Sequence, residues 1–166
     1  MKAHQRDSGR MTRNYYTTPV SLQGAANGWL SLYAKGINAR NPIGEQIAGV
    51  SCLFFAVELY LKGYLALRDK RFSRQDALKN LGHDFCKMYV EVVSVAPKEF
   101  SVELGKLLKK YGLLRNNIIE LRYPQAGRGI RFHPDLFNGR HGFETVFGII
   151  DAEIGRTNWS EWRCLS

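Results

Sequence analysis

Apolar residues recur at intervals of three and four along nearly the whole chain. That period gathers them on one face of an α-helix, whereas the alternation typical of a half-buried strand is nearly absent. Because every apolar face must be covered by another element, the pattern predicts an all-α fold, an up-and-down bundle of about five helices. The five faces lie at residues 22–37, 47–64, 85–96, 104–121 and 143–154.

Prolines and polar residues of the capping type mark the expected helix ends. The second helix should run to about Asp69, and residues 69–81 form a polar, basic link that can contain a short helical turn. Pro124 stops the fourth helix, because proline disfavours helical geometry in the residue before it. The expected helix starts are Thr17 or Thr18 with Pro19, then Pro42, Asp84 and Ser101.

The length of 166 residues suits one domain, and 45% hydrophobic with 23% charged residues is typical of a globular protein. We expect the bundle at residues 18–156, between a flexible basic tail at 1–17 and a C-terminal tail at 157–166. The first tail lacks the apolar core of a secretory signal. Three widely spaced cysteines without a CxxC pair fit a reducing cytoplasm rather than a disulfide framework or a zinc site.

The apolar run at residues 47–67 is long enough to cross a bilayer, but Glu58 and Lys62 lie near its middle. Each would cost about 2.5–3.5 kcal/mol there, so we expect a central core helix and no membrane span. Glu58 and Lys62 are four residues apart. They form either a surface ion pair or a partly buried site in which an arginine of another helix, with Arg115 as the candidate, pairs with the acid.

A second polar cluster lies at the end of the fourth predicted helix, where Arg115, Asn116, Glu120, Arg122 and Tyr123 follow one another. On a helix the two arginines share one side, and the asparagine and the glutamate share the adjoining side. This seam can hold a phosphate or the acidic groups of a partner. The alternative is a solvated last turn whose cations complement the helix dipole.

The net charge of +9 is concentrated at residues 106–140, which carry eight cations and two carboxylates with tyrosines and phenylalanines between them. Such a segment can bind nucleic acid through phosphate contacts and base stacking, or it is simply a solvated basic face. The chain contains no HExxH, Walker A, GxSxG or GxGxxG motif, so neither a metal nor a cofactor is predicted.

Three strings, AVELYLKGYL, GHDF before an amphipathic helix, and RNNIIELRYP, stand in an order and spacing that resemble the HEPN domain family. The resemblance covers about residues 20–155. It implies a HEPN-like helical bundle that is usually a homodimer across its last helices. Family members include metal-independent ribonucleases, often toxins or defence effectors, and non-catalytic members that accompany nucleotidyltransferases.

The ribonucleases of this family carry an R-x4-6-H motif, and here Arg115 and Asn116 match its start. Glu120, Leu121 and Arg122 occupy the three positions where the histidine would stand. A carboxylate there would repel an RNA phosphate and lacks the acid–base range of imidazole. The RYP ending at residues 122–124 is similar to the non-catalytic members.

We therefore predict a non-catalytic, dimeric binding or regulatory bundle that presents the seam to a nucleotide, RNA or protein partner. The partner could be a nucleotidyltransferase, in a toxin–antitoxin or defence setting. One alternative is a ribonuclease that recruits His133 or His141 from the following loop or from the partner chain. The other is a purely structural protein-interaction module whose positive charge is incidental.

Overall fold

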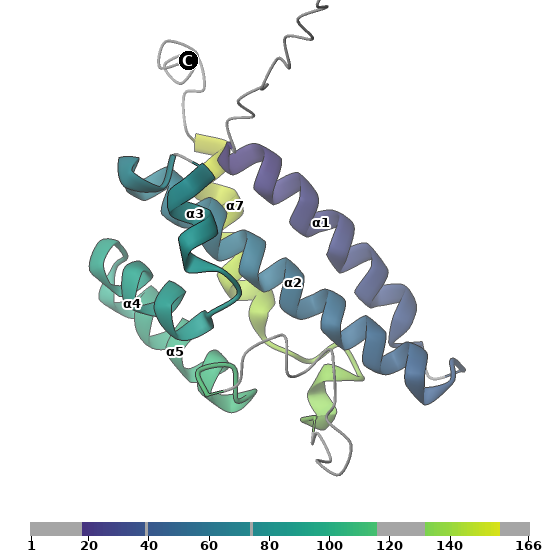
Figure 1. Cartoon of the computed structure of the whole chain (residues 1–166). Helices are drawn as coiled ribbons and strands as arrows, with labels where there is room; N and C mark the ends of the chain where they lie inside the picture. Colours follow the sequence, from purple (N-terminus) through teal and green to yellow (C-terminus); the bar gives the residue numbers. More distant parts are fainter. Residues whose placement is uncertain (1–17, 39, 74, 116–131, 157–166) are drawn as a thin grey trace, which may run out of the picture.

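The computed structural model describes residues 18–38, 40–73, 75–115 and 132–156. These residues form an all-helical bundle without a β-strand (Figure 1). The predicted tails at 1–17 and 157–166 lie outside the described residues. The six α-helices are α1 (Pro19–Gly36), α2 (Ile43–Arg68), α3 (Gln75–Leu81), α4 (Phe85–Val95), α5 (Lys98–Lys110) and α7 (Phe143–Arg156), with short 3-10 helices η1 (Lys70–Ser73) and η2 (Pro134–Leu136).

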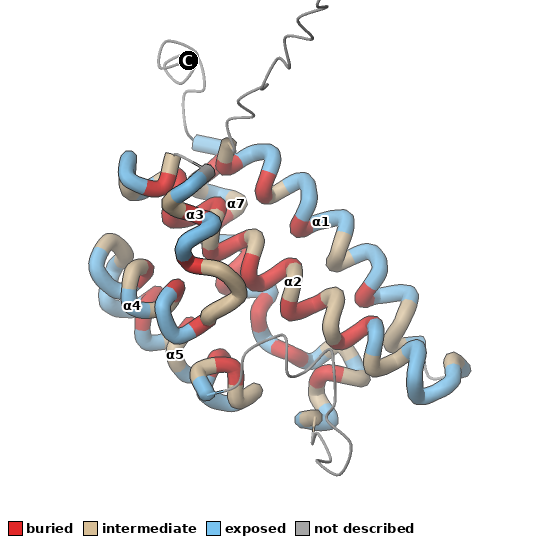
Figure 2. Tube along the Cα trace, viewed as in Figure 1, coloured by how far each residue is buried: buried red, intermediate tan, exposed pale blue. Residues whose placement is uncertain are grey.

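Helix α2 is the centre of the bundle, and it contacts α1, α4, η1 and α7. It is buried along most of its length, whereas α1, α4 and α7 each turn one buried side inward (Figure 2). Among the described helices, α2 alone is long and apolar enough to cross a membrane, judged by length and composition. Because 67% of its apolar window is buried inside the protein, α2 has the burial expected of the predicted core helix.

Helices α1 and α2 form an antiparallel hairpin whose two axes come closest at Gly36 and Gly49. A Cβ atom on Gly36 would lie 2.6 Å from the Cα of Gly49, which is closer than atoms pack. Toward the other end of the hairpin, Gly63 of α2 faces Leu22 and the carbonyl of Pro19. Glycine is therefore required where the backbones meet at the base of this hairpin.

Most of the predicted helix starts are confirmed. Thr18 caps α1, with its side chain accepting a hydrogen bond from the Ser21 N–H, and Pro19 stands in the first turn. Pro42 precedes α2, and the Asp84 side chain accepts from the Lys87 N–H at the start of α4.

Three boundary predictions are wrong. Ser101 does not cap α5: it is buried one turn inside the helix, its hydroxyl donates to the Pro97 carbonyl, and α5 begins directly after Pro97. The link at 69–81 contains more helix than the short turn allowed for it, since η1 and the seven-residue helix α3 occupy most of it. The bundle therefore has six described helices rather than about five.

The third error concerns the end of α5, which stops at Lys110 instead of continuing to residue 121. Gly112 has φ +72°, the left-handed conformation that glycine adopts most easily. Its N–H bonds to the Lys109 carbonyl, and the Leu113 N–H bonds to the Leu108 carbonyl. These two bonds form a Schellman motif, and the buried side chain of Leu113 completes it.

The glycine contact gives a stability prediction. Replacing Gly36 by Ala should lower the free energy of unfolding by about 1–3 kcal/mol, because the added methyl group forces two backbones apart. The matched control is Gly28→Ala on the same helix, where a Cβ meets no atom within 4 Å. That variant should gain up to about 1 kcal/mol from helix propensity. Urea unfolding that ranks the two variants in the opposite order would contradict the close approach.

Candidate functional site

The structure places three of the seven sequence-predicted site residues. Asn116, Glu120, Arg122 and Tyr123 lie outside the described residues. Arg115 is exposed, and it belongs to the turn after α5 rather than to a helix. The helix predicted over residues 104–121 therefore ends before Arg115, and the rest of the predicted seam lies outside the described residues.

Glu58 and Lys62 are brought together with His83, which the sequence analysis had not included in the site. The Glu58 side chain is buried, with a residue exposure of 3%. Its Oε1 accepts from Lys62 Nζ at 2.7 Å, and its Oε2 lies 2.8 Å from His83 Nδ1. The surface-pair alternative is therefore wrong. The buried-acid alternative holds, with His83 in the place that Arg115 was expected to take.

The backbone of the α3–α4 turn explains how His83 reaches α2. Gly82 adopts φ +57° after the last residue of α3, and Asp84 immediately caps α4. The chain thus turns within three residues and places the His83 ring against the middle of α2. The signal for this contact was the GHDF string, in which a turn glycine and a capping aspartate flank the histidine.

The hydrogen bonds fix the tautomer of a neutral His83 ring. A carboxylate only accepts hydrogen bonds, so Nδ1 carries the proton that is directed at Glu58. Nε2 is then left as an acceptor. The His83 side chain is 39% exposed, while the Lys62 side chain is 12% exposed. The cluster is therefore a buried acid that orients two basic side chains near the surface.

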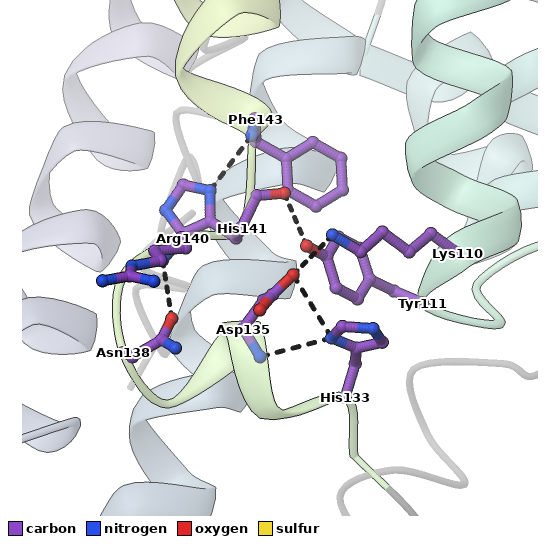
Figure 3. A network of polar contacts seen from close by, with 8 residues as sticks. All are labelled: Lys110, Tyr111, His133, Asp135, Asn138, Arg140, His141 and Phe143. Atoms are coloured by element: carbon purple, nitrogen blue, oxygen red, sulfur yellow. Dashed lines mark hydrogen bonds and ion pairs between the residues drawn. The ribbon is translucent and has the colours of Figure 1, made fainter.

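A second polar cluster joins the end of α5 to the segment before α7 (Figure 3). Lys110 Nζ lies 2.6 Å from Asp135 Oδ2, and this hydrogen bond lowers the pKa of the Asp135 carboxyl and raises that of the Lys110 ammonium. The Tyr111 hydroxyl donates to the His141 carbonyl at 2.7 Å. From α1, the Tyr33 hydroxyl donates to the Leu136 carbonyl, and burial raises its pKa to about 12. Residues 132–142 are thus fastened to both α5 and α1.

The two histidines that were proposed for a ribonuclease have different surroundings. His141 is buried; its Nδ1 accepts from the Phe143 N–H at 3.1 Å, and its Nε2 lies 3.3 Å from a Glu144 oxygen. Both ring nitrogens are therefore engaged. His133 is 41% exposed, and its Nδ1 accepts from the Asp135 N–H at 3.2 Å. The same His133 nitrogen also lies 3.5 Å from Asp135 Oδ2.

Both clusters belong to the same end of the α4–α5 hairpin. These helices are antiparallel, since they are joined at Pro97, and Tyr89 of α4 donates its hydroxyl to the Ser101 carbonyl of α5. The start of α4 follows His83, and the end of α5 precedes Arg115. Both therefore lie at the same end of the hairpin (Figure 1).

Exposed cations lie at the end of α5 and in the segment before α7. Lys110 is neutralised by Asp135, and Lys106 lies 3.5 Å from Glu103. Lys109, Arg115 and Arg140 are exposed and form no ion pair with any described residue. Within the same described part of the chain, no group of three His, Cys, Asp or Glu side chains could hold a metal ion.

Comparison with known proteins identifies no relative of this chain. No family model matches the chain, and neither a curated protein nor a solved structure matches it.

The buried pair gives a second stability prediction. Glu58→Ala should lower the free energy of unfolding by about 3 kcal/mol, because it leaves the largely buried Lys62 ammonium without its counter-ion. The double variant Glu58→Leu/Lys62→Leu should recover most of this loss. The control is Glu103→Ala, which removes an exposed pair and should cost less than about 1 kcal/mol. Equal losses for the two alanine variants in urea unfolding would show that Glu58 is not the buried centre described.

His141 gives a pH prediction. Burial lowers the pKa of its imidazole, and the nearby Glu144 opposes this only in part. The unfolded chain, with a His pKa of about 6.5, therefore binds a proton that the folded chain does not bind. The free energy of unfolding should fall as the pH drops from about 7 to about 5. His141→Gln should flatten this fall, and an unchanged pH slope in the variant would contradict the assignment.

Proposed function

We propose that this protein is a non-catalytic binding module of the HEPN type, which binds RNA or another phosphate-bearing nucleotide at the basic end of α5. The observation that carries the proposal is the group of exposed, unpaired cations formed by Lys109, Arg115 and Arg140. Arginine presents a planar fork of donors that suits a phosphate group.

Two further features support the HEPN assignment. Every described element of regular secondary structure is a helix. The first two motif strings that carry the resemblance also meet in space, since Glu58 of one string contacts His83 of the other. A shared polar contact gives a physical reason for these strings to occur together in one chain.

The opposing interpretation is a solvated basic face. The C-terminal end of α5 carries a partial negative charge, and Lys109 and Lys110 complement it without any ligand. Arg115 and Arg140 lie beyond the helix, where this argument is weaker because the dipole effect fades within the last turn. These two arginines therefore favour a ligand over simple dipole compensation.

We also propose the assembly and setting that the resemblance implies: a homodimer in the cytoplasm, with a nucleotidyltransferase as a possible partner. Most apolar residues of α5 and α7 pack inside a single chain and are not available for a dimer interface. Buried in its core are Leu104, Leu107, Val146 and Ile150. A dimer across the last helices would use what stays exposed there, including Ile149, which is 37% exposed.

Binding of a fluorescent single-stranded RNA 12-mer, measured by anisotropy at several salt concentrations, tests the proposal. The wild-type protein should bind, and its affinity should fall as salt is added. Lys109→Ala/Arg115→Ala should weaken binding and make the salt slope shallower by about 1.4, which corresponds to two lost phosphate contacts on a single strand.

The matched control is Lys70→Ala/Arg156→Ala. It removes two exposed cations, one just after the C-terminal end of α2 and one at the C-terminal end of α7. This control should bind RNA like the wild type. Equal binding by all three proteins would leave the structural-module alternative, in which the charge is incidental. Cleavage of the RNA during the titration, lost in His133→Ala, would favour the ribonuclease alternative.

A further inference from the structure

A cavity of about 520 Å³ is lined by residues of η1, α3 and α4. This volume is typical of a site for a small molecule. Phe72 and Leu81 are its most buried lining residues, at 6% and 7% exposure, whereas Val90 is 62% exposed. The remaining lining residues are Arg71, Ala77, Asn80, Cys86, Lys87 and Glu91. The cavity therefore combines a largely apolar surface with a few polar groups.

The two cations of the lining differ in how far their charges are already offset. Arg71 Nη2 lies 2.6 Å from Asp69 Oδ2 and 3.2 Å from Glu91 Oε2, so these charges are paired within the chain. Lys87 Nζ lies 3.9 Å from Asp84 Oδ2, which is too long for a hydrogen bond. Lys87 therefore keeps its N–H donors for another acceptor.

Asn80 adds a second donor to the cavity. Within the described parts of the chain, its side-chain amide forms no hydrogen bond. An amide of this kind donates through two N–H groups. Lys87 and Asn80 thus present donors beside an apolar surface, and a ligand that matches both features is an acceptor of negative charge with an apolar body.

We propose that this cavity binds a small carboxylate with an apolar chain, whose carboxylate is held by Lys87 and Asn80 while its chain lies on the wall around Val90. A single negative charge matches Lys87, the one cation of the lining that is not hydrogen-bonded to an acid, whereas a phosphate dianion would need more cations. Burial of the chain removes apolar surface of Val90 and of the ligand from water. This site goes beyond the proposed RNA binding, because it shares no residue with the exposed cations at the end of α5.

Octanoate, octanol and octylamine are the probes, because they carry the same chain with a negative, a neutral and a positive end. Each is titrated against the isotope-labelled protein, and amide shifts are followed by NMR. Octanoate should bind with a dissociation constant of about 1 mM and shift residues of η1, α3 and the first half of α4. Octanol should bind about tenfold more weakly, because it cannot accept charge-assisted hydrogen bonds, and octylamine should bind more weakly still.

Cys86 provides an independent readout, because it is exposed and lines the cavity. Saturating octanoate should slow its alkylation by iodoacetamide, followed by mass spectrometry of the Cys86 peptide. Alkylation of Cys52, which belongs to α2 and does not line the cavity, should keep its rate.

Two variants with matched controls test the two contacts. Lys87→Met removes the ammonium and keeps an apolar stem, so it should weaken octanoate binding about tenfold and leave octanol binding unchanged. Its control is Lys106→Met, which removes a similarly exposed cation of an i,i+3 pair on α5. Val90→Asp places a negative charge in the wall and should prevent octanoate binding. Val102→Asp, at an exposed valine outside the cavity, should bind octanoate like the wild type.

All four substituted residues are exposed, and circular dichroism melts check that each variant is folded. Equal affinity of the wild type for octanoate and octanol, unchanged octanoate affinity in Lys87→Met, or shifts that spare η1, α3 and α4 would overturn the carboxylate site. A wild-type dimer in sedimentation that Val90→Asp dissociates would show that a second copy covers the cavity, and would overturn it as well. RNA binding that fails while octanoate still binds would overturn only the proposed function.

Discussion

The contact of one buried carboxylate with two basic side chains organises the end of the α4–α5 hairpin at which we propose that a ligand binds. Glu58 lies on the central helix, where its two oxygens are occupied by Lys62 and His83. Because His83 sits in the turn between α3 and α4, this contact fixes where α4 begins relative to α2. The position of α4 determines that of α5, and the end of α5 carries the exposed cations. The proposed phosphate site therefore depends on Glu58.

The remaining architecture supports this arrangement from the other side. The segment before α7 is tied to α5 by the Lys110–Asp135 and Tyr111–His141 contacts and to α1 by Tyr33 (Figure 3). The turn after α5 and the start of segment 132–156 are thereby held near each other. A ligand at this end would meet a surface whose backbone is fixed by interactions with α5 and α1, which limits the entropy lost on binding.

The sequence was sufficient for the helical class and for most helix starts, because apolar period and capping residues are local signals. The signal for the end of α5 is also local, because Gly112 followed by the apolar Leu113 is typical of a Schellman motif. The sequence analysis missed this signal because the apolar residues continue at helical spacing beyond Gly112. Ser101 was misplaced because Pro97 already opens the helix. The partner of Glu58 could not be predicted from spacing, since His83 lies 25 positions further along the chain, beyond a helix end, two further helical segments and a turn.

Amide chemical-shift mapping of a short single-stranded RNA on the isotope-labelled protein tests the central claim most directly. The account predicts that the largest shifts among the described residues fall at the turn after α5, near Arg115 and Arg140, and at the α3–α4 turn around His83. These two turns lie at one end of the α4–α5 hairpin. Shifts confined to the opposite end, around η1 and the last turn of α7, would contradict the account, as would a spectrum that RNA leaves unchanged.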